Sequence, residues 1–96
     1  MTNAVFWEAR AQKDREQVWH YLREEVGLKV ANATDERFTQ AAELLKTHPQ
    51  AGSLYGSVNR RRLALARLPF IIVYATAPGA IYILRVLHTS QRRKYE

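Results

Sequence analysis

The stretch from Asn59 to His88 constrains the fold more than any other part of this 96-residue chain. It contains three consecutive segments in which apolar residues alternate with other residues or in which β-branched and aromatic residues dominate, as strands favour. We predict strands at Arg61–Arg67, Leu68–Thr76 and Ala80–His88. Short connections join these segments, so we expect them to form an antiparallel meander.

The turn between the last two strands has a clear chemical signature. The residues Ala77-Pro78-Gly79-Ala80 place proline second and glycine third. Proline fixes φ as the second position of a turn requires, and glycine tolerates the positive φ of the third position of a type II turn. We therefore predict a type II turn at this point.

The first two of these strands differ in the residues that they carry. Between Pro69 and Ala77 both faces of the strand are apolar, which predicts a central strand covered by helices on at least one side. The preceding strand has Arg61 and Arg67 flanking its leucines on one face, and Arg62 on the other. Its charges favour a position near the edge of the sheet.

The N-terminal segment begins with a short apolar and aromatic stretch, Ala4–Glu8, which predicts another strand. A helix is predicted over Ala11–Val26, because its apolar residues recur on one helical face. Gly27 is a natural C-terminal stop for that helix. Trp7 and Trp19 both fit apolar faces, so we expect both in the core.

A second helix follows after a predicted connector at Leu28–Ala31. Asn32 or Thr34 can cap this helix, because their side chains can accept hydrogen bonds from its first N–H groups. The helix is expected to end near Thr47-His48, since a proline follows and disfavours helical geometry in the residue before it. Gln50–Ser57, which contains two glycines, is predicted to be a loop.

These elements predict a single α+β domain over residues 1–96 with the order β-α-α-β-β-β. Both helices are amphipathic, so we expect a two-helix hairpin packed on one face of a mostly antiparallel four-stranded sheet. The opposite face is expected to be less covered, and to hold a groove with basic residues beside it.

The net charge of +6 is distributed unevenly. From Arg60 to the end there are eight basic residues and one acid, Glu96, whereas every other acid lies at or before Glu43. Such a field attracts nucleic acid or an acidic protein partner, although a solvated basic surface that aids solubility would have the same composition. The candidate binding residues are Arg60, Arg62, Arg67, Arg85, His88, Arg92 and Arg93.

Several classes of site have no support in the sequence. There is no cysteine, no local spacing that joins the three histidines into a metal site, and no glycine-rich phosphate loop, so we expect no metal and no cofactor. No apolar run approaches the roughly 18 residues that a membrane span needs, and the N-terminus lacks the pattern of a secretory signal. These features predict a cytoplasmic protein that does not enter a membrane.

Arg85 and His88 are the residues most suggestive of chemistry, and Tyr95 with further arginines lies just beyond them. A histidine base with nearby arginines can serve phosphodiester cleavage, because the arginines stabilise the developing charge. The alternative is a histidine at a strand end that bonds to the backbone. Sequence alone leaves both open.

The chain resembles the ParE/RelE superfamily of bacterial type II toxins over nearly its whole length. The resemblance rests on His48-Pro49-x-x-Gly52, then RLALARLPFIIVYAT, then IYILRVLHTSQR, in this order and spacing. The LPFIIVY segment and the ending ILRVLH followed by arginines are most similar to the ParE branch.

This resemblance implies a growth-inhibiting toxin neutralised by a cognate, ParD-like antitoxin in a hetero-oligomeric complex. In the family the antitoxin commonly binds as an amphipathic helix in a groove plus an extended piece along the sheet. ParE-like members act on DNA gyrase and stabilise its cleaved-DNA complex. RelE-like members cut mRNA on the ribosome. A third hypothesis, outside toxins, is a basic module that acts only as a transcription co-repressor with its partner.

The sequence departs from the RelE nuclease pattern at two positions. Nucleases of that branch carry an arginine two positions before the Val-Tyr pair of the central strand, where this chain has Ile71; the YoeB type ends in His-Tyr, where His88 precedes Thr89. We therefore expect a ParE-like gyrase poison that is not an enzyme, with an mRNA endonuclease as the alternative. The nuclease would use His88, Arg85, Arg62 and Tyr95.

Overall fold

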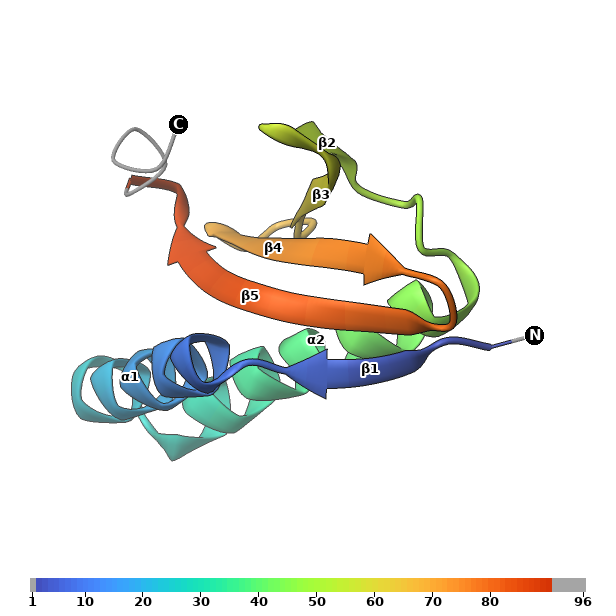
Figure 1. Ribbon diagram of the computed structural model, residues 1–96. Coiled ribbons are helices and arrows are strands. Elements are labelled where there is room, and N and C mark those ends of the chain that lie inside the picture. Colours follow the sequence, from blue (N-terminus) through green and yellow to red (C-terminus); the bar gives the residue numbers. More distant parts are fainter. Residues whose placement is uncertain (1, 91–96) are drawn as a thin grey trace.

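The computed structural model describes residues 2–90, which form two layers. The elements are β1 (Ala4–Trp7), α1 (Ala9–Glu25), α2 (Leu28–Thr47), β2 (Ser53–Tyr55), β3 (Ser57–Ala64), β4 (Phe70–Ala77) and β5 (Ala80–His88). Both helices lie on the same side of the sheet (Figure 1). The predicted α+β class and helical hairpin are confirmed, but the sheet has five strands where four were predicted.

The strand order is β1-β5-β4-β3-β2, so β4 is central, as its two apolar faces predicted. The strands from β2 to β5 pair antiparallel, and β1 pairs parallel with β5. The turn between β4 and β5 brings Ala77 opposite Ala80. Gly79 has φ 73°, the positive value that the third position of a type II turn requires.

The fifth strand, β2, lies in the stretch predicted to be a loop. Its three residues pair with β3, with Ser53 opposite Arg62. Gly56 has φ 83° and allows the tight reversal from β2 to β3. The glycines on either side of β2 make it look like a loop in the sequence, whereas backbone pairing with β3 makes it a strand.

The predicted boundaries of β3 and β4 were wrong at the loop that joins them. β3 runs over Ser57–Ala64 instead of Arg61–Arg67, and β4 begins at Phe70 instead of Leu68. Arg67 has φ 65°, and the N–H of Leu68 bonds to the carbonyl of Leu65 across a turn. A residue with left-handed backbone geometry interrupts an extended strand, so the segment in which leucine and arginine alternate does not form a single strand as far as Arg67.

The second helix begins at Leu28, so the predicted connector at Leu28–Ala31 was wrong. Gly27 has φ 122° and turns the chain directly from α1 into α2. Asn32 and Thr34 therefore lie inside the helix and do not cap it. The side chain of Asn32 instead accepts a hydrogen bond from the Trp19 indole at 2.8 Å. Neither α1 nor α2 combines the length and the apolarity that a bilayer crossing needs.

The main core lies between the helices and the sheet. Phe38 and Leu45 of α2 are fully buried against β4 residues that include Ile72. The rings of Phe38 and Phe70 meet edge to face at 5.4 Å. Each such buried side chain stabilises the fold by roughly 1.5–3 kcal/mol through the apolar surface that it removes from water. Trp7 packs against this core as predicted, but Trp19 is not part of it.

Candidate functional site

The sheet face opposite the helices, which we call the open face, has an apolar floor with arginines around it. Ile71 and Val73 of β4 and Leu87 of β5 form the buried floor. A groove of about 460 Å³ lies over this floor. Its lining residues are Glu8, Ala9, Arg10, Arg60, Val73, Leu84, Arg85 and Leu87. The predicted basic groove on the less covered face is therefore confirmed.

Arg60 and Arg62 stand on the open face because β3 alternates its side chains between the two sides. Arg60 lies opposite Ala75, and Arg62 lies opposite Val73. Arg60 is exposed, whereas the Arg62 guanidinium lies over the Tyr55 ring at 5.2 Å. Tyr55 in turn packs against the apolar floor. A cation over an aromatic face is electrostatically favourable, so Arg62 helps to cover this floor.

Arg85 is held in a salt bridge with Asp14 of α1. Its Nε donates to one carboxylate oxygen at 2.8 Å and its Nη2 to the other at 3.2 Å. The two side chains are 17% and 13% exposed, so solvent screens this pair less than a surface pair. Arg85 was predicted to bind a target or antitoxin, and the structure gives it a role in joining α1 to β5.

The same carboxylate protects the edge of β5. Among the described strands, β1 pairs with β5 only as far as Ile83. Beyond that point the N–H of Val86 donates to Asp14 Oδ2 at 2.9 Å. An unpaired edge group invites pairing with other chains, and here a helix side chain satisfies it instead. Asp14 therefore fixes the first helix at the point where the parallel strand ends.

A second groove, of about 690 Å³, lies between the helical hairpin and the end of β5. We call it the hairpin groove. Its helical wall includes Tyr21, which is 65% exposed, and Val30, which is 41% exposed. Its other residues are Asp14, Gln17, Val18, Leu22, Thr34, Leu68, Pro69, Phe70, Arg85, Val86, His88 and Ser90. Exposed apolar side chains gathered in a groove with a few charged groups are typical of a partner-binding surface.

His88 lies at the end of β5, on the side of the sheet that the helices cover. Its ring meets the Phe70 ring edge to face at 5.4 Å. The Ser90 N–H donates to His88 Nδ1 at 3.1 Å, and the Ser90 hydroxyl lies 2.8 Å from the same atom. These contacts match the alternative considered from the sequence, a strand-end histidine bonded to the backbone.

The structure separates Arg62 from the other described residues proposed for a nuclease, since Arg85 and His88 both line the hairpin groove. In β5 the residue Leu84 is extra in the pairing with β4, and this bulge shifts the alternation of side chains. Val86 therefore faces the main core, and His88 follows it to the helical side, whereas Arg62 stands on the open face. The sheet separates the proposed base from that arginine.

The remaining predicted site residues lie elsewhere. Arg67 is exposed in the loop between β3 and β4, outside the lining of both grooves. The predictions for Arg92, Arg93 and Tyr95 lie outside the described residues.

The HPxxG motif has a structural explanation in the buried Tyr74. Its hydroxyl donates to the Pro49 carbonyl at 2.8 Å and accepts the Gly52 N–H at 2.8 Å. A Cβ atom at position 52 would lie 2.5 Å from the Arg62 carbonyl oxygen, so the chain needs glycine there. Burial raises the pKa of Tyr74, more than the Gly52 hydrogen bond and the Arg61 charge lower it. The motif therefore anchors a loop to the central strand.

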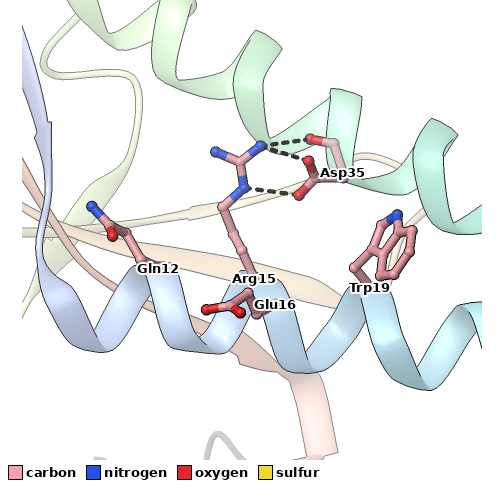
Figure 2. A pocket seen from close by; sticks show the side chains of 5 residues that line it. All are labelled: Gln12, Arg15, Glu16, Trp19 and Asp35. Atoms are coloured by element: carbon pink, nitrogen blue, oxygen red, sulfur yellow. Dashed lines mark hydrogen bonds and ion pairs between the residues drawn. The ribbon is translucent and has the colours of Figure 1, made fainter.

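A hollow on the outer side of the helical hairpin is structural. Figure 2 shows Arg15 reaching from α1 to Asp35 of α2, where both carboxylate oxygens accept hydrogen bonds at 2.8 Å. The same guanidinium lies 4.5 Å from the centre of the Trp7 ring. The Arg15 guanidinium is thus paired with groups of the same chain, and its contacts join β1, α1 and α2.

Nothing in the described part of the chain resembles a metal centre. Within residues 2–90 no three histidine, aspartate or glutamate side chains lie together in a way that could hold a metal ion.

Two contributors to these surfaces were missed from the sequence. Arg10 lies in the first turn of α1 and completes the basic groove, although the sequence showed it as one of many surface arginines. Asp14 is separated from Arg85 by 71 positions, so no local pattern reveals that they pair. An alignment of related sequences could have revealed such a pair through correlated changes.

Comparisons with known proteins agree with this architecture. Residues 5–93 match the family model described as the ParE toxin of the type II toxin-antitoxin system parDE. The chain is also similar to a solved structure of a chromosomal ParDE toxin-antitoxin system from P. aeruginosa. The TM-score is 0.81 with 20% sequence identity, and the match covers 91% of this chain and 96% of that one. No match was found among curated proteins. The chain belongs to the ParE toxin family of type II toxin-antitoxin systems.

Proposed function

We propose that this toxin inhibits growth by poisoning DNA gyrase in the cytoplasm, and that a ParD-like antitoxin neutralises it. Membership of the ParE family supports a toxin of the type II class. The observation that carries the choice of target is that the sheet separates Arg62 from His88, while Arg85, which lines the same groove as His88, is held by Asp14. A ribonuclease needs a base and a charge-stabilising cation around the same phosphate.

The centre of the open face adds to this argument. Ile71 occupies the position at which the RelE-like nuclease pattern has an arginine. Its side chain is 4% exposed and belongs to the apolar floor. An aliphatic side chain cannot balance charge on a phosphate. Arg85, the arginine of β5, is engaged with Asp14. Toxicity through binding to gyrase requires no catalytic group on the toxin.

The hairpin groove is the proposed seat of an amphipathic antitoxin helix. It offers apolar side chains from both helices, and Asp14, Arg85 and His88 also line it. Apolar residues repeated along one helical face of the partner would fill the groove, and acidic residues of the partner would complement the net positive charge of the chain. The excess positive charge of the chain favours such an acidic partner.

The target is tested with antitoxin-free protein in two assays, gyrase with supercoiled plasmid and translating ribosomes with a defined mRNA. The proposal predicts cleaved plasmid and intact message. His88→Ala is expected to leave plasmid cleavage unchanged, because the histidine is assigned no chemistry. Cut message with normal supercoiling, abolished by His88→Ala, would instead establish the endonuclease.

The antitoxin surface is tested by charge placed in the hairpin groove. Val30→Glu should weaken rescue of growth by co-expressed antitoxin while toxicity without antitoxin persists. Lys29→Glu is the matched control, because it adds a carboxylate one residue away at an exposed position outside the groove lining. Equal rescue of both variants would place the antitoxin elsewhere.

A further inference from the structure

The open face carries an exposed aromatic pair that the fold does not use. Phe6 of β1 lies opposite Tyr82 of β5, and their rings stack with centroids 5.4 Å apart and planes 21° apart. Phe6 is 50% exposed and Tyr82 is 37% exposed. Neither belongs to the clusters of apolar residues that form the cores on the two sides of the sheet. Their solvent-facing surface is therefore available to a ligand.

The pairing of the strands continues this aromatic pair into a row across the sheet. Tyr82 lies opposite Ala75 of β4, and Ala75 lies opposite Arg60 of β3. Neighbouring strands are about 4.8 Å apart, so the backbone positions of Tyr82 and Arg60 are roughly 10 Å apart, with the small Ala75 between them. Across the sheet the row thus presents an aromatic ring, then a small alanine that leaves space above it, and then a cation.

We propose that this row binds single-stranded nucleic acid, with a base stacked against the Phe6–Tyr82 pair and backbone phosphates beside Arg60 and Arg10. Both arginines line the basic groove next to the row. Every base has a π face that stacks on aromatic rings, and a positively charged groove follows the phosphates. The inference goes beyond gyrase poisoning, because this binding requires neither gyrase nor antitoxin.

Single-stranded nucleic acid fits the row better than the other polyanions do. In duplex DNA the bases are stacked within the helix and cannot reach Tyr82, so a duplex would engage the arginines alone. An acidic peptide would also use the arginines and leave the aromatic pair without a role. The combination of exposed stacked rings with arginines selects a ligand that has both flat apolar groups and regularly spaced negative charge.

The test measures fluorescence anisotropy of the full chain with four labelled probes. These are an oligothymidylate, an oligouridylate of the same length, a duplex of that length and a poly-glutamate peptide. Both single strands should bind at least about tenfold more tightly than the duplex or the peptide. A preference between the two single strands would assign the site to DNA or to RNA. Equal or tighter binding of the duplex or the peptide would overturn the proposal.

Matched variants locate the binding. Tyr82→Leu keeps an apolar side chain but removes the ring, and it should weaken single-strand binding about tenfold. Tyr21→Leu is the control, since it removes an exposed ring from the helical hairpin. Phe6→Leu gives a second reading of the same site if Tyr82→Leu fails to fold. Equal affinities for the three variants would overturn the proposal.

The arginines are tested through salt dependence. Each phosphate contact contributes about −0.7 to the slope of log affinity against log salt for single strands. Arg60→Ala should make the slope shallower by about that amount, while Lys29→Ala should not change it. An unchanged slope for Arg60→Ala would remove Arg60 from the site. A chain that poisons gyrase but binds no oligonucleotide would retain the proposed function and lose this inference.

Discussion

The two faces of β4 have equally buried side chains at their centre, but different groups cover them. On one face Phe70, Ile72 and Tyr74 lie beneath the helices. On the other, Ile71 and Val73 lie beneath Tyr55 and Leu84, with arginines around them. The first cover is made by whole helices and the second by individual side chains.

This difference separates stability from recognition. The side chains beneath α2 are held in fixed positions, because protein interiors are close-packed. On the other face, arginines and single rings could move aside for a partner at a smaller cost in free energy, because long arginine side chains can cover apolar surface while their charged groups stay in water. The exposed Phe6–Tyr82 pair and the basic groove both lie on the second face.

The largest expected effect is a loss of stability on the helical face. Phe38→Ala removes a fully buried ring that contacts Phe70, and should lower the free energy of unfolding by about 3–5 kcal/mol. Leu87→Ala on the open face should cost about 2 kcal/mol, because the covering side chains can settle into the space. Urea unfolding of both variants measures the contrast. Equal losses would show that the two covers are equally rigid.

Asp14→Ala is expected to cause the next largest loss of stability after Phe38→Ala, although Asp14 is not in either core. It leaves Arg85 without its partner carboxylate and the Val86 N–H without its acceptor, so we expect a loss of about 2–3 kcal/mol. Glu16→Ala, at an exposed position on the same helix, is the control in the same unfolding experiment. A loss no larger than that of the control would show that the contacts of Asp14 with Arg85 and Val86 do not stabilise the fold.

Tyr74→Phe should cost about 1–2 kcal/mol, because it removes the hydroxyl shared by Pro49 and Gly52. The pH dependence should also change. Burial raises the pKa of Tyr74 above its ordinary value of 10.0, so the folded protein holds this proton more tightly than the unfolded chain. The contribution is complete below pH 10 and is lost as the pH rises through the raised pKa. Thermal melts above pH 10 should fall more steeply for the wild type than for Tyr74→Phe; parallel falls would contradict this.

The smallest effect on stability is expected at Arg60. Arg60→Ala removes an exposed side chain, and should change the free energy of unfolding by no more than about 0.5 kcal/mol. The same unfolding curves used for Phe38→Ala provide the measurement. A loss of 2 kcal/mol or more, on the order of a core substitution, would mean that the arginines of the open face support the fold.

Much of the fold could be predicted because local rules and tertiary structure agree in β4. β-branched and aromatic residues on both faces placed this strand at the centre, and Pro78-Gly79 set the turn that follows it. The basic groove was also predicted, because the acids are concentrated in the first half of the chain. The strand and the turn depend on residue type within one short segment, and the groove prediction depends on the charge balance of the second half of the chain.

The arrangement of the site could not be predicted, because it depends on one inserted residue and on distant pairs. Strict alternation from Tyr82 would have put His88 on the open face with Arg62, and the bulge at Leu84 moved it to the other side. The pairing of Asp14 with Arg85 is equally invisible in a single sequence. β2 was missed because its strand character comes from its neighbour and not from its own residues.

The parallel pairing of β1 with β5 has a consequence for the synthesis of the protein. Ala4 pairs with Ala80, and Asp14 binds Arg85 and Val86, so the first strand and helix of the domain depend on its last strand. While the chain is being translated, β1 has no strand to join and α1 has no sheet edge to protect until β5 leaves the ribosome. The two-layer fold is thus completed only after β5 has been synthesised.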